Sequence, residues 1–371
     1  MKTVRKLIFR ETGRSVLLAL LGFVALFVFF DFIDELDQIG RVSALDPTRV
    51  FNPLDAMVGI ALGLPSRVYE LLPICVLIGS IFAMARLGQS SEFTVLRSAG
   101  LSPLRALKLT LTMGLGFALL TFVMGDYIAP ITDKIQTLSR AEFNGGLSRS
   151  DQGVWLKERT AQGSAAVRVG AMRGDGQLQN IQVYNFDASG VLLERIEAPL
   201  AKTDEQGKWY LQNATLTRYL THLKQPTIEQ SRHPSLLWHS NISTGMVTSA
   251  MVDPAQLNTT DLFLYVQHLQ ANQQDAQTHE IAFWRKVFYP LSSLVMTFMA
   301  LPFAYLHTRR GSVAEFLFLG VMGGIGFFLL SNITGHMGNL KDWPPWLAAA
   351  SPSVAFLLLS LATFRWLVVR R

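Results

Sequence analysis

The chain has 371 residues, of which 50% are hydrophobic and only 16% are charged, and its mean hydropathy is +0.28. Soluble globular proteins carry about 25% charged residues, so this composition excludes that class. The net charge of +6 does not indicate a nucleic-acid-binding face, because Lys and Arg cluster at the ends of apolar runs. Cys75 is the only cysteine, so no disulfide can form within the chain.

Six runs approach the length of about 20 apolar residues that a bilayer crossing requires. Their approximate ranges are 15–32, 68–85, 104–128, 282–307, 313–333 and 346–369. The first run is longer than the apolar core of a usual signal peptide, and it leads into Asp31 and Asp34 without a small-residue cleavage site. We therefore predict a retained anchor and a polytopic membrane protein.

Basic residues mark one side of the membrane. They occur before the first run, between the second and third, between the fourth and fifth, and at the end of the chain: Lys2, Arg5, Lys6, Arg10, Arg14, Arg86, Arg97, Arg105, Lys108, Arg309, Arg310, Arg365, Arg370 and Arg371. By the positive-inside rule these segments lie in the cytoplasm. We therefore expect both termini to be cytoplasmic and the acidic loop after the first run to lie on the other side.

The polar stretch between the third and fourth runs is then expected outside the cytoplasm. It contains short runs that alternate apolar and polar residues, at 154–156, 165–172, 178–186, 191–196 and 209–219. Strands of this kind, separated by turn residues, predict an antiparallel sandwich, jelly roll or partly open barrel. Such a domain either holds an acyl chain or has an ordinary packed core, and the pattern leaves both open. Residues 259–278 are expected to form a polar helix.

Motifs for nucleotide binding and catalysis do not occur. The sequence has no G-x-x-x-x-G-K-[ST] segment, no H-E-x-x-H, no C-x-x-C and no G-x-S-x-G. The histidines show no metal-ligand spacing. We therefore expect no metal, no cofactor and no catalytic residue in this chain, so that a partner would supply the energy for any work.

The segment 90–100, between the second and third runs, has the pattern of a short amphipathic helix. A Ser cap opens it, Glu92 lies near its positive end, and a Gly closes it. Phe93 and Leu96 give it an apolar face. This face either rests on the lipid interface or docks in a groove of a cytoplasmic partner.

Charged residues gather at the outer ends of the first two runs. Asp31 and Asp34 end the first run, and Arg67 and Glu70 begin the second. Ionisable groups at this depth either snorkel to the lipid headgroups or face a water-filled cavity or polar ligand.

Taken together, these features resemble the LptF/LptG (YjgP/YjgQ) family of lipopolysaccharide export permeases from Gram-negative bacteria. The resemblance covers essentially the whole chain. It is carried by Phe32-Ile33-Asp34-Glu35-Leu36, by Ser91-Glu92 through Ala99-Gly100, by Ala129-Pro130, and by Trp284 through Leu291. The first and last of these stretches are closer to the LptG branch than to the LptF branch.

The resemblance implies six transmembrane helices and a periplasmic jelly-roll-like β domain in an inner-membrane protein. Residues 1–128 would hold helices one to three, 129–280 the β domain with its return helix, and 281–371 helices four to six. The chain would be a non-catalytic permease subunit of an ABC transporter. That transporter extracts lipopolysaccharide from the inner membrane and passes it to a periplasmic bridge toward the outer membrane.

The resemblance also implies partners and site residues. The partners are a dimer of an LptB-like ATPase that binds the ATP and Mg, an LptF-like second permease, an LptC-like protein at the periplasmic face, and lipopolysaccharide. Glu92, Phe93 and Leu96 would seat in the ATPase. Residues of the first, second and fifth helices and of the loop after the first would line the lipid cavity and its gates: Phe27, Phe30, Ile33, Asp34, Gln38, Arg41, Arg67, Phe327, Phe328 and Asn332.

One feature departs from the family pattern. Family members often place Lys or Arg just after the Phe-Ile-Asp stretch, where those residues can pair with lipid phosphates. This chain has Asp37 and Gln38 there. We expect Arg41 and Arg67 to take over the phosphate pairing.

Three alternatives remain. The first alternative is that the chain is the paralogous LptF. The second is a membrane enzyme that acts on lipid headgroups through Asp31, Asp34 or Glu70. The third is a scaffold that binds an external partner through its β domain.

Overall fold

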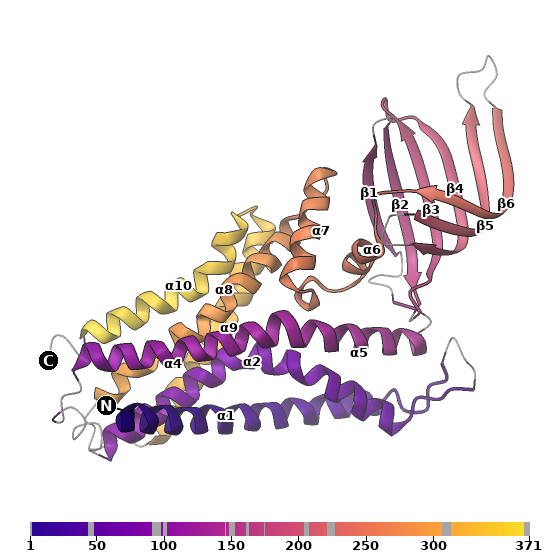
Figure 1. Ribbon diagram of the computed structural model, residues 1–371. Helices are drawn as coiled ribbons and strands as arrows, with labels where there is room; N and C mark the ends of the chain where they lie inside the picture. Colours follow the sequence, from indigo (N-terminus) through magenta and orange to yellow (C-terminus); the bar gives the residue numbers. More distant parts are fainter. Residues whose placement is uncertain are drawn as a thin grey trace. The chain divides into compact units, whose positions relative to one another are not determined.

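The computed structural model describes residues 2–43, 48–90, 98, 102–144, 146–147, 153–160, 163–173, 175–203, 208–220, 227–305 and 313–366. The chain folds into two compact units. The helical unit comprises Met1–Asp34, Gly63–Ile131 and Glu280–Arg371, and the sheet unit comprises Glu35–Leu62 and Thr132–His279. Figure 1 shows the helices and strands that each unit contains.

Six helices in the described ranges are long and apolar enough to cross a membrane. They are α1 (Lys2–Leu36), α2 (Pro53–Gln89), α4 (Pro103–Val123), α8 (Gln277–Ala300), α9 (Val313–Leu340) and α10 (Pro345–Phe364). A π-helical turn, η1 (Met124–Ile128), joins α4 to α5 (Ala129–Asn144). The six predicted membrane runs are therefore confirmed as helices.

Local sequence explains where some of these helices begin. The Ser102 side chain accepts a hydrogen bond from the Arg105 amide at 3.4 Å, and Pro103 occupies the first turn of α4. Pro345 likewise begins α10. The helix α2 begins at Pro53, well before residue 68, where the predicted run began, and Pro65 and Pro73 lie inside this helix without ending it.

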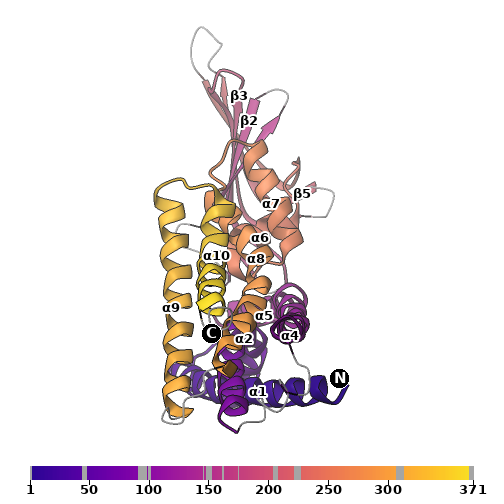
Figure 2. The same cartoon turned by 90° about the vertical axis from the view of Figure 1, so that its left-hand side faces the viewer.

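The core of the helical unit is built on α2. Of the residues in its most apolar stretch, 72% are buried, against 6% for α1. Three glycines of α9 let the two backbones approach: a Cβ added at Gly320 would lie 3.3 Å from the Cα of Ile78, and one added at Gly323 would lie 3.2 Å from the Leu77 side chain. At Gly324 an added Cβ would lie 2.6 Å from the Ile74 side chain. Figure 2 shows α9 and α10 side by side.

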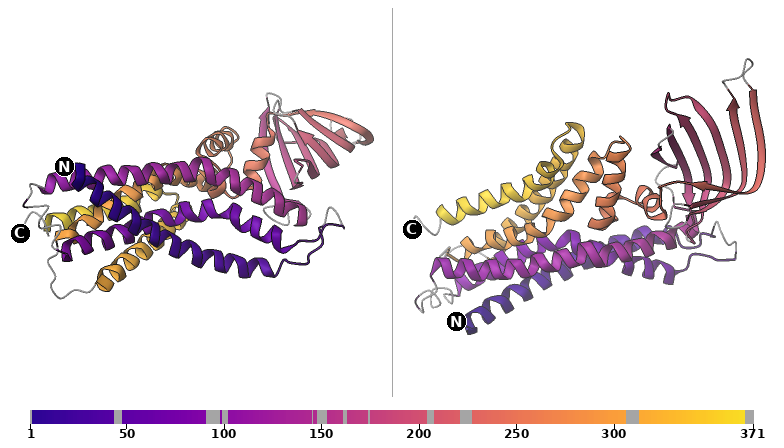
Figure 3. Two further views of the ribbon diagram at one scale, coloured as in Figure 1. Left: turned by 60° about the horizontal axis from the view of Figure 1, so that its bottom comes forward. Right: turned by 45° about the horizontal axis from the view of Figure 1, so that its top comes forward.

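The sheet unit contains one antiparallel sheet in the order β1-β2-β3-β4-β5-β6. Its strands are β1 (Val154–Thr160), β2 (Gly163–Met172), β3 (Leu178–Asp187), β4 (Leu192–Thr203), β5 (Lys208–Leu220) and β6 (Thr227–His239). Each strand pairs with its neighbour in sequence, and within the described strands β1 and β6 do not pair, so the sheet is open. Figure 3 shows this single curved layer. The predicted fold class, six membrane helices plus an antiparallel β domain, is confirmed.

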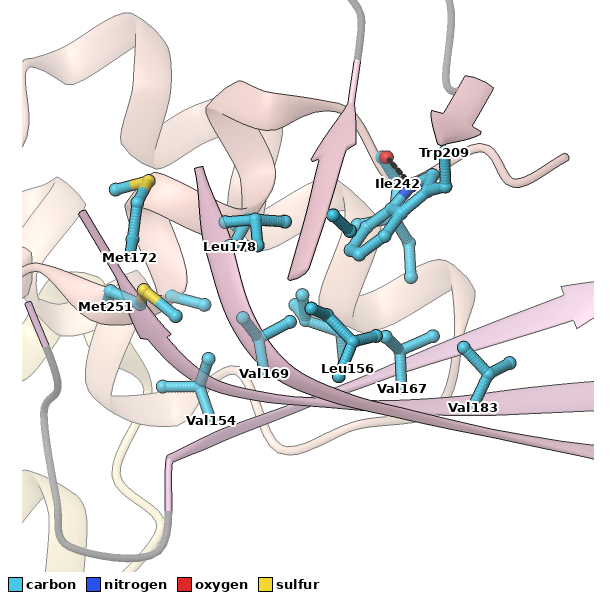
Figure 4. Close-up of a cluster of buried hydrophobic side chains, with 14 of the residues drawn as sticks. Val154, Leu156, Val167, Val169, Met172, Leu178, Val183, Trp209, Ile242 and Met251 are labelled. Carbon is cyan, nitrogen blue, oxygen red and sulfur yellow. Dashed lines mark hydrogen bonds between the residues drawn. The ribbon is translucent and has the colours of Figure 1, made fainter. Parts of the chain in front are cut away.

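Two helices of the same unit, α6 (Thr244–Met251) and α7 (Thr259–Ala271), contribute to the core on the inner face of the sheet. Figure 4 shows buried residues of β1, β2, β3 and β5 around Trp209. The Trp209 indole is fully buried and donates a hydrogen bond to the Ile242 carbonyl at 3.0 Å. This bond satisfies the polar atom of the largest side chain in the core.

Three details differ from the sequence prediction. Helical structure continues through α5, where the β insert was expected to begin. The single helix expected over 259–278 is instead two helices, because the chain turns at Asn272 and at Gln273, whose φ is +53°. The sixth strand was not predicted: β6 is mostly exposed and contains Pro234, so it lacks the alternation that identified the other five.

Candidate functional site

The residues expected to couple to an ATPase lie outside the part of the chain that the structure describes. These are Glu92, Phe93 and Leu96. The preceding helix α2 is described to its end at Gln89.

Arg67, inside α2, and Asp31, near the C-terminal end of α1, form an ion pair in the helical unit. The Nη2 atom of Arg67 lies 2.8 Å from Oδ1 of Asp31, and its Nε lies 3.3 Å from Oδ2, which gives a bidentate pair. Glu70 contributes a second carboxylate at 3.8 Å, and the Phe27 ring lies 5.5 Å from the guanidinium carbon. One cation therefore faces two carboxylates, so Asp31 and Glu70 compete with any anion that binds Arg67.

The other predicted residues of α1 face outward. Phe30 and Ile33 are 52% and 44% exposed, and Asp34 is exposed as well. Large apolar side chains so exposed on a membrane helix face lipid or another membrane protein.

The three predicted residues of α9 do not share one face. Phe327 is 3% exposed and packs edge-on against Phe356 of α10, with ring centroids 5.3 Å apart. Phe328 is 54% exposed, and Asn332, one turn further along, is also exposed. The structure therefore places Phe328 and Asn332 on the outside of the helical unit and Phe327 in its interior.

Gln38 and Arg41 belong to the sheet unit, in a turn that follows α1. The Gln38 amide donates to the Glu35 carbonyl at 3.0 Å, and the Arg41 amide donates to the Gln38 carbonyl at 3.1 Å. The Arg41 side chain is exposed. It therefore has the access that phosphate pairing requires.

A second ion pair, which the sequence did not reveal, lies in the sheet unit. The Glu35 side chain is only 3% exposed, and its Oε1 atom accepts a hydrogen bond from Arg140 of α5. In the same unit, Gln136 of α5 donates to the Gly59 carbonyl of α2 at 2.6 Å. Arg140 was missed because residues from 129 onward were assigned to the β domain rather than to a helix that extends α4.

The inner face of the sheet supports the packed-core alternative. Val167, Val183, Trp209 and Leu211 are fully buried, and side chains of α6 and α7 belong to the same apolar cluster (Figure 4). This part of the sheet has no free apolar surface for an acyl chain. Within the described residues there is also no group of three or more His, Cys, Asp or Glu side chains placed to hold a metal ion.

Comparison with known proteins gives a match over nearly the whole chain. Residues 6–366 match the model of the family described as lipopolysaccharide export system permease LptF/LptG. The permease protein LptG of Escherichia coli (strain K12) is 28% identical over 323 residues, which cover 86% of this chain and 87% of that protein. LptG of Haemophilus influenzae (strain Rd) is 25% identical over 320 residues, covering 85% and 86%. With its six membrane helices and its antiparallel sheet, the chain belongs to the LptF/LptG family of lipopolysaccharide export permeases.

Proposed function

We propose that the chain is the LptG-type permease subunit of an ABC transporter that extracts lipopolysaccharide from the inner membrane and passes it to a periplasmic bridge. The observation that carries this proposal is the family match over residues 6–366. The relatives named LptG support the choice of branch. The chain is a multi-pass inner-membrane protein. We further propose that both of its termini are cytoplasmic and that its sheet is periplasmic.

In this proposal the chain has no catalytic role and carries no cofactor. An LptB-like ATPase dimer binds ATP and Mg, an LptF-like permease provides the other half of the lipid cavity, and an LptC-like protein receives the lipid at the periplasmic face. The exposed apolar side chains of α1 and α9 support a cavity that is closed only by a partner. Phe30, Ile33 and Phe328 would contact acyl chains, and Asn332 would lie at the same gate.

Arg67 and Arg41 would pair with the phosphates of the lipid, since both keep accessible guanidinium groups. At Arg67 the phosphate would compete with Asp31, whereas Arg41 is exposed in its turn. Asp34 and Gln38 would offer further polar contacts to the lipid. Phe27 would hold the Arg67 side chain in place through its ring.

The segment 90–100 would transmit the work of the ATPase. Closure of the two ATPase subunits on ATP would push on Glu92, with Phe93 and Leu96 filling an apolar groove in the ATPase. The helices attached at each end of this segment, α2 and α4, would pass the motion to the lipid cavity.

A charge reversal tests this coupling. Glu92→Arg is expected to dissociate the ATPase or to abolish lipid-stimulated ATP hydrolysis, because a cation replaces an anion in the partner groove. Glu92→Gln, which keeps the shape of the side chain, is expected to have a smaller effect. The measurements are ATPase copurification and lipopolysaccharide release from proteoliposomes, with circular dichroism to verify that the helices remain folded. Normal export by the Glu92→Arg chain would contradict the coupling role.

A further inference from the structure

One turn of α8 donates hydrogen bonds to the main chains of three other helices of the helical unit. The donors are Arg285, Lys286 and the hydroxyl of Tyr289. Their acceptors are, in the same order, the carbonyl oxygens of Ser331 in α9, of Gly125 in η1 at 2.9 Å, and of Glu70 in α2 at 2.6 Å. Two neighbouring cations of α8 therefore attach to two different helices.

Hydrogen bonds from cations to carbonyls are strong in an apolar medium, since neither partner finds water there. Lys286 is 8% exposed, and its ammonium group also lies 5.8 Å from the centre of the Tyr69 ring. The π-helical turn η1 presents the Gly125 carbonyl to it. The hydrogen bond from Lys286 thus joins α8 to η1.

The Arg285 contact fixes one turn of α9. A Cβ added at Gly335 would overlap the Arg285 guanidinium, so the glycine leaves the space that this group fills. Ser331 and Gly335 are four residues apart and lie on one face of α9. Asn332 follows Ser331 directly, and Phe328 lies one turn before Asn332 on the exposed face. The position of the helical turn at Ser331 therefore determines the orientation of the Phe328 and Asn332 side chains.

The two halves of α9 are held by different interactions. The first half packs through Gly320, Gly323 and Gly324 against apolar side chains and backbone of α2. The second half packs against α10, where a Cβ added at Gly338 would lie 2.7 Å from the Ala348 Cβ. Against α8, it has the Arg285 contact at Ser331 and a close approach at Gly338, where an added Cβ would lie 3.0 Å from the Ile281 side chain.

We propose that Arg285 is a positioning residue for the lipid-facing part of α9. Its guanidinium fixes the turn at Ser331 against α8 and so holds Phe328 and Asn332 at the orientation that lipid export needs. This inference rests on the proposed function, because Phe328 and Asn332 are lipid contacts only in that account.

Hydrogen–deuterium exchange of the complete transporter tests the proposal with a matched pair of variants. Arg285→Gln is expected to raise amide exchange several-fold in residues 329–340 and to leave residues 314–324 unchanged. Lys286→Gln, the neighbouring cation, is expected to raise exchange in residues 124–128 and to leave α9 unchanged. Equal exchange of α9 in Arg285→Gln and the unsubstituted chain would overturn the proposal. Equal loosening of α9 by both variants would overturn it as well.

Two further variants separate positioning from a general loss of stability. Arg285→Lys is expected to restore slow exchange in part, because an ammonium group can still donate to the Ser331 carbonyl. Gly335→Ala displaces the guanidinium without removing it, so it is expected to reproduce the Arg285→Gln pattern even if Arg285→Gln fails to fold. Normal exchange in Gly335→Ala would count against the proposal.

A functional measurement shows whether the position matters for export. Arg285→Gln is expected to lower lipopolysaccharide-stimulated ATP hydrolysis several-fold while basal hydrolysis and subunit assembly stay unchanged. If Arg285→Gln lowers lipid binding without any change in α9 exchange, Arg285 contacts the lipid instead and the positioning role is wrong. If the unsubstituted chain assembles with no ATPase, the proposed function fails, and the exchange measurement still decides the contact between Arg285 and α9.

Discussion

Single charged residues in this protein are engaged by partners that the sequence does not reveal. Arg67 lies in a bidentate pair with Asp31, with Glu70 nearby, and Glu35 is buried against Arg140. In the proposed function, such pairs decide which cations remain available to a lipid phosphate. For Arg67, availability depends on the strength of the competing carboxylate.

We predict opposite effects for the two partners of the Arg67 pair. Asp31→Asn frees the guanidinium and is expected to strengthen lipopolysaccharide binding, whereas Arg67→Gln is expected to weaken it. Because the pair is partly exposed, each change is expected to be worth about 0.2–1 kcal/mol, or up to about fivefold in affinity. Binding of labelled lipopolysaccharide to the purified complex measures both. Changes of the same sign in the two variants would contradict the competition.

The sequence identified the three residues around Arg67 but did not show that they form ion pairs. It placed Arg67, Asp31 and Glu70 together because all three border the same pair of membrane runs. It missed Arg140, because the residues from 129 onward were assigned to the β domain rather than to a helix. It missed the acceptors Ser331 and Gly125, because any residue type can offer a main-chain carbonyl. It grouped Phe327 with Phe328, although only the helix orientation shows that one is buried and the other exposed.

At the scale of elements, the alternation of apolar and polar residues identified the strands that bury one face, and the length of the apolar runs identified the membrane helices. The five alternating runs became five strands, and the six long apolar runs became six helices. The exposed strand β6 has no buried face and therefore no pattern. The turn at Asn272 was missed because it is stabilised by contacts with a distant part of the chain. The Asn272 side chain accepts a hydrogen bond from the Arg159 amide at 2.7 Å, and the Gln274 side chain accepts one from the Lys157 amide at 3.2 Å, both at the edge of β1.

The contact between α7 and β1 also contains a titratable group. Burial lowers the pKa of His268, and the negative charge of Glu158 on β1 opposes this shift. The His268 Nδ1 atom lies 3.3 Å from the Asn272 amide nitrogen, and its ring stacks on Tyr265. Glu158 is itself held by the Ser240 hydroxyl and the Asn241 amide. The neutral form of His268 is the one that this environment favours.

We predict that mild acid loosens this contact. As pH falls, His268 in the unfolded chain binds a proton at the ordinary histidine pKa of about 6.5, whereas His268 in the folded chain binds it only at a lower pH. The free energy of unfolding therefore has its full value above pH 6.5 and decreases below it, by at most about 1.4 kcal/mol per pH unit. Hydrogen exchange of α7 and β1 in the complex at pH 7.5 and 5.5 measures this. His268→Gln, which cannot titrate, is expected to remove most of the pH dependence; an unchanged pH dependence would contradict the role of His268.

At the scale of the whole molecule, the chain has the form of one part of a larger assembly. Exposed apolar side chains cover α1 and the outward face of α9, and the helix α1 has few buried residues of its own. A lone protein would leave these faces to lipid, whereas a paired permease would enclose lipid between them. The family match assigns the chain to the export permeases. The proposed function adds the subunit composition of the assembly, which can be measured directly.

Native mass spectrometry of the tagged chain, purified gently in detergent from its own host, makes that measurement. The account predicts a complex of this permease, a second permease and two ATPase subunits, carrying an adduct of the mass of lipopolysaccharide. A single chain or a homodimer, stable and free of lipid, would contradict the account and would favour a headgroup enzyme or a scaffold instead.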